Sequence, residues 1–198
     1  MSQFATSISN EELAGLPAAQ FDGEIVVVDT EEALERAYAA LSQERVLGFD
    51  TETRPSFTAG YVNKVALIQL STLERCYLIR LCRMKKFPER VVQLLCDEKI
   101  MKIGVGVTGD VIGLNKIRKF RARGFFELQD YVKRFGIENF SLRKISAIVL
   151  GERVSKAQRL SNWEASSLTG QQKMYAATDA WVCLRIYNAL RMAEQRSK

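Results

Sequence analysis

The chain has 198 residues, of which 47% are hydrophobic and 26% charged, so it is long enough for one well-buried globular domain. It contains no histidine, which excludes Ser-His-Asp and Cys-His catalysis and any zinc site built on histidine. The first 35 residues carry eight acidic and no basic side chains, leaving a remainder with 29 basic and 15 acidic residues that suits a polyanionic partner.

The hydrophobic pattern predicts strands and helices that alternate behind a polar segment. Residues 1–23 show no strong period and are expected to form a loose lead-in, with a single domain at 24–198. The predicted strands lie at 24–30, 46–52, 64–72, 75–81, 99–105 and about 125–128. The predicted helices lie at 31–43, 88–98, about 110–120, about 128–136, 141–150 and about 169–191. This order predicts an α/β fold, a mixed sheet of five to six strands with helices on both faces.

The chain shows no sign of export or membrane insertion. No apolar stretch reaches the length of a membrane span, and the N-terminus lacks the basic start and apolar core of a secretory signal. The four cysteines have no CxxC spacing and lie mostly in apolar runs, which predicts buried free thiols and argues against a zinc site. We therefore expect a cytoplasmic protein. The sequence makes no prediction of its oligomeric state.

The first candidate for chemistry is the stretch VLGFDTETRPSF at residues 46–57. Asp50 and Glu52 end an apolar strand and, two residues apart, project from the same face. Side by side, two like charges repel, so water or a metal ion must compensate them. A solvated strand end is the common explanation of such a pair, but the ends of central strands are also where sites form in open α/β sheets.

The second candidate is the glycine-rich run KIGVGVTGD. Gly104, Gly106 and Gly109 follow a predicted strand and have the spacing of a dinucleotide fingerprint, with Glu127 as the acid beyond it. Asp110 counts against a pyrophosphate at this helix start. The alternatives are a turn that points Asp110 into a cleft, or a plain helix N-terminal acid.

The third candidate is YAATD near the end of the chain. Tyr175 and Asp179 are spaced i, i+4 and share one helix face. Tyrosine is often a core residue and a helical aspartate is often solvated, yet Asp179 lies in an apolar segment and would need a partner there. With Asp50, Glu52 and Asp110, these residues make an oxygen-only set that suits Mg²⁺ or Mn²⁺ and two-metal phosphoryl chemistry.

Taken in order, FDTE, VGVTGD and YAATDAWVCLRIY resemble the three motifs of the DEDD exonucleases. The tyrosine four residues before the last aspartate is the feature that resembles the DEDDy branch of this superfamily. That branch includes ribonuclease D and the Werner-type exonuclease domain. The resemblance covers about residues 24–192. It implies a ribonuclease H-like fold and stepwise 3′→5′ release of nucleoside 5′-monophosphates. It also implies that Asp50, Glu52, Asp110 and Asp179 hold two divalent ions while Tyr175 orients the attacking water.

The expected partner is a single-stranded 3′ end of DNA or RNA. The basic stretches 116–124 and 143–159 could guide its phosphates. Thr51 and Arg54 could touch the terminal nucleotide. Trp163 could stack on a base or be buried beside the last helix. Two other functions stay open from the sequence: a non-catalytic nucleic-acid-binding module, and a dinucleotide-binding oxidoreductase built on GVGVTG.

Overall fold

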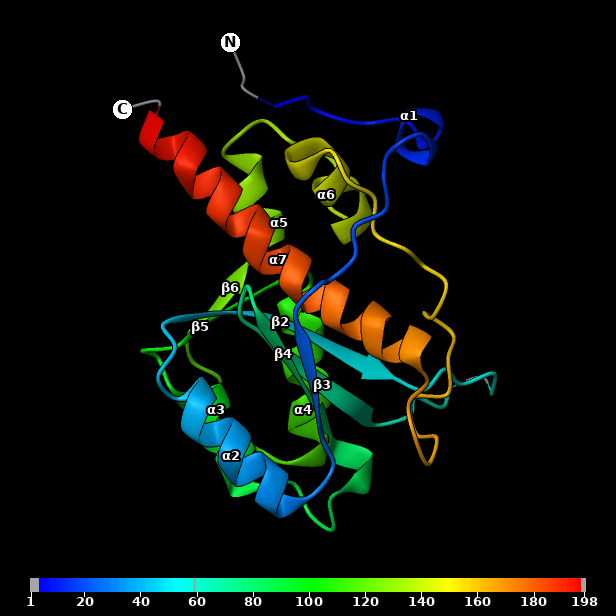
Figure 1. The fold of residues 1–198 in the computed structure, drawn as a ribbon, viewed down its shortest axis with the longest axis vertical. Helices are drawn as coiled ribbons and strands as arrows, with labels where there is room; N and C mark the ends of the chain where they lie inside the picture. The colour runs from blue at the N-terminus through cyan, green and yellow to red at the C-terminus, as the bar shows by residue number, and fades with distance from the viewer. Residues whose placement is uncertain (1–3, 59, 197–198) are drawn as a thin grey trace.

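The computed structural model describes residues 4–58 and 60–196, so residues 1–3 of the expected lead-in lie outside the described part. Its sheet has six strands in the order β1-β4-β3-β2-β5-β6 (Figure 1). The strands are β1 (Glu24–Val28), β2 (Val46–Thr53), β3 (Val65–Ser71), β4 (Arg75–Arg80), β5 (Met101–Gly104) and β6 (Phe125–Glu127). The pairs β2/β3 and β3/β4 are antiparallel and the other three are parallel, which confirms the predicted mixed sheet.

Helices cover both faces of this sheet, as the alternating pattern predicted. One face packs against α2 (Glu31–Leu41), α3 (Glu89–Cys96) and α4 (Val107–Ile117). The other face packs against α5 (Leu128–Lys133), α6 (Leu142–Leu150) and α7 (Gly170–Arg196). A short 3₁₀ turn, η1 (Leu81–Arg83), follows β4. No helix among the described residues combines the length and apolarity that crossing a membrane requires.

The long helix α7 runs across the sheet (Figure 1) and begins where its capping residues predict. The Thr169 hydroxyl accepts a hydrogen bond from the backbone N–H of Gln172 at 3.1 Å, and the Gln172 side chain accepts from the N–H of Thr169 at 2.9 Å. This capping box satisfies two N–H groups that the first helical turn leaves open. The helix continues to Arg196, five residues beyond the predicted end near Arg191.

Strand β2 divides its side chains between the two faces with the period of two that a strand imposes. Leu47 and Phe49 enter the core beneath α2, α3 and α4. Gly48 faces α7, and a methyl group on it would lie 1.9 Å from the carbonyl oxygen of Ala180. Only glycine therefore allows α7 to cross β2 this closely.

Helix α4 begins at Val107, three residues before the predicted start at Asp110. Gly106 precedes it with φ of 77°, a left-handed conformation that glycine adopts without strain. The Glu127 carboxylate accepts hydrogen bonds from the backbone N–H groups of Gly106 at 3.0 Å and Val107 at 2.9 Å. An acid distant in the sequence thus caps this helix, which the local sequence pattern could not indicate.

The lead-in segment is packed onto the domain, so the expectation that it is loose was wrong for residues 4–23. It contains a short helix, α1 (Asn10–Ala14), with a capping box at Ser9. Leu13 and Phe21 are buried, at 0% and 1% exposure. A few well-spaced apolar side chains anchor a segment whose overall composition is polar, and no periodic pattern announces them.

Replacing Gly48 with alanine should destabilise the protein by about 3 kcal/mol, the upper end of the usual cost of overpacking, because the added methyl group overlaps backbone and not a movable side chain. Urea unfolding followed by circular dichroism measures this. Gly109→Ala is the matched control, since nothing lies within 4 Å of a methyl group there, and its stability should change by less than about 1 kcal/mol. Equal effects of the two substitutions would contradict the account of the crossing.

Candidate active site

Three carboxylates meet where the end of β2 lies beneath α7. Asp50 and Glu52 follow Gly48 on the same face of β2, and Asp179 precedes Ala180, the residue whose carbonyl touches Gly48. Oxygens of the three side chains all lie within 4.8 Å of one another. The close helix crossing therefore brings Asp179 to Asp50 and Glu52, which lie 129 and 127 positions before it in the chain.

The protein environment disfavours negative charge on these three groups. Burial and then repulsion from Asp179 and Asp110 raise the pKa of Asp50 well above its usual range. Burial followed by repulsion from Asp50, Asp179 and Asp110 raises the pKa of Glu52 to about 10. Burial also raises the pKa of Asp179 to about 8, although the Tyr175 hydroxyl acts to lower it. Without a compensating cation the cluster would hold protons at neutral pH.

The donor set fits a divalent cation. Every ligand offered is a carboxylate oxygen, which is the chemistry that Mg²⁺ and Mn²⁺ prefer. The Oδ1 atom of Asp179 is buried and has no hydrogen-bond partner among the described residues. A buried carboxylate oxygen with no partner is costly, and a bound cation would satisfy it.

Asp110 lies beside this cluster but is not one of the three mutually close carboxylates. Its Oδ1 atom accepts a hydrogen bond of 2.5 Å from the hydroxyl of Thr51, which lies between Asp50 and Glu52 in β2. Burial raises the pKa of Asp110 to about 6, while this hydrogen bond lowers it. The first turn of α4 thus places a fourth acid at the edge of the site, as expected from the GVGVTGD run.

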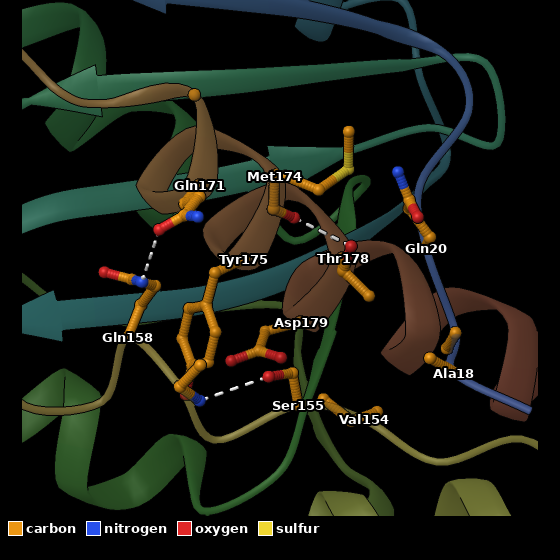
Figure 2. Close-up of a pocket in the computed structure, with 13 residues that line it drawn as sticks. Ala18, Gln20, Val154, Ser155, Gln158, Gln171, Met174, Tyr175, Thr178 and Asp179 are labelled. Carbon is orange, nitrogen blue, oxygen red and sulfur yellow. Dashed lines mark hydrogen bonds between the residues drawn. The ribbon is translucent and has the colours of Figure 1, made fainter. Parts of the chain in front are cut away.

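Tyr175 lies one turn before Asp179 on α7, and Figure 2 shows both side chains pointing into the same cavity. Burial, with further repulsion from Asp179, Glu52 and Asp50, raises the pKa of the Tyr175 phenol. The hydroxyl therefore keeps its proton at neutral pH. It is suited to orient a reacting group through a hydrogen bond and not to act as a base.

The dinucleotide-binding hypothesis was wrong. A pyrophosphate would need the N-terminus of α4, where the Glu127 carboxylate already binds the N–H groups of Gly106 and Val107. A methyl group on Gly104 would lie 2.9 Å from the carbonyl oxygen of Phe49, so glycine at this position lets the backbone pass close to β2. The alternative prediction, a turn that points Asp110 into a cleft, accounts for Gly104 and Gly106, while Gly109 has nothing within 4 Å of a methyl group placed there.

Comparison with known proteins decides the family. A family model described as 3′-5′ exonuclease matches residues 25–193. The chain belongs to the 3′-5′ exonuclease family. The bifunctional 3′-5′ exonuclease/ATP-dependent helicase WRN of Mus musculus is 38% identical over 184 residues, covering 88% of this chain and 13% of that protein. The chain spans less than half the length of three curated relatives that it matches.

Solved structures show the same fold. The Aedes aegypti Nibbler EXO domain superposes with a TM-score of 0.82 at 22% identity, covering 91% of this chain and 94% of that one. Trypanosoma brucei RNase D, in complex with RNA U12, gives a TM-score of 0.75 at 20% identity, covering 94% of this chain and 66% of that one. These matches confirm the ribonuclease H-like architecture that the motifs implied.

Two cavities border the carboxylates of this exonuclease domain. The larger, about 520 Å³, lies between residues 18–20, the loop at 154–158 and the first turns of α7, and both Tyr175 and Asp179 line it (Figure 2). The other, about 370 Å³, is lined by Thr51 and Asp110 together with two lysines, Lys64 and Lys116. The larger cavity thus has no charged side chain apart from Asp179, whereas the other has the two lysines beside Asp110.

The three weaker substrate-binding predictions have different outcomes. The Trp163 side chain has 0% exposure and packs near Tyr175 with ring centroids 6.0 Å apart, so stacking on a base was wrong and the burial alternative is confirmed. Arg54 is half-exposed and forms an ion pair of 3.2 Å with Glu164. Thr51 donates its hydroxyl to Asp110. Contact of Arg54 or Thr51 with a nucleotide stays a prediction.

Gln69 was missed at the sequence level although it lies beside the site. It pairs directly with Asp50 across β2 and β3, is completely buried, and its amide has no hydrogen-bond partner among the described residues. Paired residues of antiparallel strands project from the same face, so the Gln69 amide lies alongside the acid. The available signal was a single polar residue inside the apolar strand VALIQLS.

Removing one charge from the cluster should stabilise the metal-free protein. The pKa of Asp179 is raised on folding, so as pH rises from about 4 to about 8 the folded state loses stability relative to the unfolded one. At pH 8 in EDTA, Asp179→Asn should therefore raise the free energy of unfolding by about 1–2 kcal/mol. For a domain of this size that corresponds to a melting temperature roughly 2–8 °C above that of the natural protein. Excess Mn²⁺ should raise the melting temperature of the natural protein, and the rise should be much smaller for the variant.

The control for this measurement is Asp29→Asn, because Asp29 is exposed and lies outside the cluster. Its melting temperature should match that of the natural protein with and without Mn²⁺. A metal-free Asp179→Asn protein that melts lower at pH 8 would show that the carboxylates stabilise the fold by some other means.

Proposed function

We propose that this chain is a metal-dependent 3′→5′ exonuclease that releases nucleoside 5′-monophosphates from 3′ ends of DNA or RNA. The observation that carries the proposal is the group of three carboxylates within 4.8 Å of one another in a domain of this family. Phosphodiester hydrolysis places negative charge on the attacking and leaving oxygens, and divalent cations held by such a group stabilise both.

The roles follow from the positions of the side chains. Asp50, Glu52 and Asp179 would hold the metal ions, Mg²⁺ or Mn²⁺, with Asp110 contributing from the edge of the site. Tyr175, protonated because burial raises its pKa, would position the attacking water by a hydrogen bond. The phosphates of the retained strand would lie in the cavity with Lys64 and Lys116.

We also propose that the protein is cytoplasmic. All four cysteines are free, and burial raises the pKa of Cys76 to about 12 and that of Cys183 well above its usual range. Cys82 is exposed and still carries no disulfide, and exposed free thiols persist in a reducing compartment.

The decisive experiment uses 5′-labelled single-stranded DNA and RNA with the protein in Mg²⁺ or Mn²⁺. We expect a ladder that shortens from the 3′ end, disappears in EDTA and falls at least about 100-fold in Asp50→Asn, because the cluster loses both charge and a ligand. Asp29→Asn should cleave like the natural protein. Retardation of intact substrate on a native gel, without cleavage, would instead identify a nucleic-acid-binding module.

Lys116→Ala should weaken substrate binding and lower the slope of log K against log salt by about one, because one phosphate contact is lost. Fluorescence anisotropy of a labelled oligonucleotide in Ca²⁺, at several salt concentrations, measures the slope. Lys99→Ala is the control, since Lys99 is exposed and precedes β5, at the end of the sheet opposite the site. An unchanged slope for Lys116→Ala would remove this cavity from the proposed path.

A further inference from the structure

Residues 16–21, here called the strap, lie alongside α7 before the chain enters β1 (Figure 1). The family model begins at residue 25, so it does not cover the strap. Two residues of the strap that line the larger cavity, Ala18 and Gln20, are exposed, and Ala19 between them is buried. The strap therefore adds to the site a wall that the family match does not include.

Backbone hydrogen bonds hold the strap in place. The N–H of Ala19 donates to the carbonyl of Arg153 at 2.9 Å, and the N–H of Arg153 donates to the carbonyl of Pro17 at 2.8 Å. The N–H of Phe21 donates to the Thr178 hydroxyl at 3.1 Å, on the residue next to Asp179. The strap is thus hydrogen-bonded both to Arg153, which precedes the 154–158 loop, and to α7.

The cavity that the strap completes is suited to an uncharged group. Among the residues that line it, Asp179 carries the only charged side chain, and no lysine or arginine is present. A phosphate would be repelled there, because nothing opposes its charge except a metal ion at the carboxylates. At about 520 Å³ the cavity is within the usual size range of small-molecule sites, and methionine, alanine and valine side chains offer apolar contact to a planar base.

The Gln20 amide is available to such a base. Two other glutamines line the cavity, but Gln158 donates to Gln171 at 3.4 Å and also accepts a hydrogen bond from Ser161. Within the described part of the chain, the Gln20 side chain has no hydrogen-bond partner, and Figure 2 shows it on the strap across from Met174. An amide offers one donor and one acceptor in a plane, which matches the edge of a nucleobase.

We propose that Gln20 determines base preference at the 3′ end by contacting the base of the terminal nucleotide in this cavity. The inference rests on the proposed exonuclease function and goes beyond it, because it assigns a specificity residue to a segment outside the family match. The base lies between the strap and the first turns of α7, while the phosphate to be cleaved lies at the carboxylates.

The test uses four oligonucleotides that differ only in the 3′-terminal base, and it measures kcat/KM for removal of that nucleotide. The natural protein should show a preference among the four bases. Gln20→Leu should change the ratio of kcat/KM between the most and the least preferred base by about fivefold or more. Leucine keeps the approximate size of the side chain and removes its hydrogen bonds. Gln43→Leu, at an exposed glutamine beyond α2, should leave the ratio unchanged.

A second measurement separates this inference from the proposed function. Calorimetric titration of the four nucleoside 5′-monophosphates in Mg²⁺ should show the same order of preference and its loss in Gln20→Leu. If the natural protein cleaves no oligonucleotide, the proposed function fails, and this titration still decides whether Gln20 reads a base. A Gln20→Leu protein with unchanged ratios, an equal loss for all four bases, or no base preference in the natural protein would overturn the inference.

Discussion

Helix α7 crosses strand β2 so closely that position 48 has no room for a side chain, and the candidate active site depends on this contact. A methyl group on Gly48 would lie 1.9 Å from the backbone of Ala180. Asp179 precedes Ala180 and Asp50 lies two residues beyond Gly48, so the distance between helix and strand sets the distance between the two acids. A larger residue at 48 would move the two acids apart, since packed interiors yield little to added volume.

The same contact creates an electrostatic cost that the fold alone does not offset. Burial and mutual repulsion raise the pKa of Glu52 to about 10 and that of Asp179 to about 8. Such shifts lower the stability of the folded state at any pH above the usual pKa range of carboxyl groups. Groups with strongly shifted pKa values are commonly found at functional sites. Asp50, Glu52 and Asp179 could hold a divalent cation, which would remove the repulsion and supply positive charge for the proposed chemistry. The feature that weakens the metal-free fold is thus the one that supports that chemistry.

Local periodicity predicted most of the fold, and the short motifs, with the resemblance they carry, predicted the acids of the site. The period of two placed Asp50 and Glu52 on one face, and the i, i+4 spacing placed Tyr175 beside Asp179. Contacts between distant segments could not be predicted this way. Glu127 caps α4 from the end of β6, Trp163 is buried, and the polar segment before β1 is anchored by Phe21. Each depends on a tertiary partner that no local pattern identifies.

The two cavities beside the carboxylates suggest how the proposed enzyme would distinguish the ends of a strand. The neutral cavity borders the cluster through Asp179 and Tyr175 on α7, and the lysine-containing cavity borders it through Thr51 and Asp110 on β2 and α4. A terminal nucleotide has one phosphate, whereas the remaining strand has many. The end with less charge therefore fits the neutral side, and the polyanionic remainder fits the side with Lys64 and Lys116. Because the strap forms one wall of the neutral side, a continuing strand would meet it, and removal would proceed one nucleotide at a time from the end.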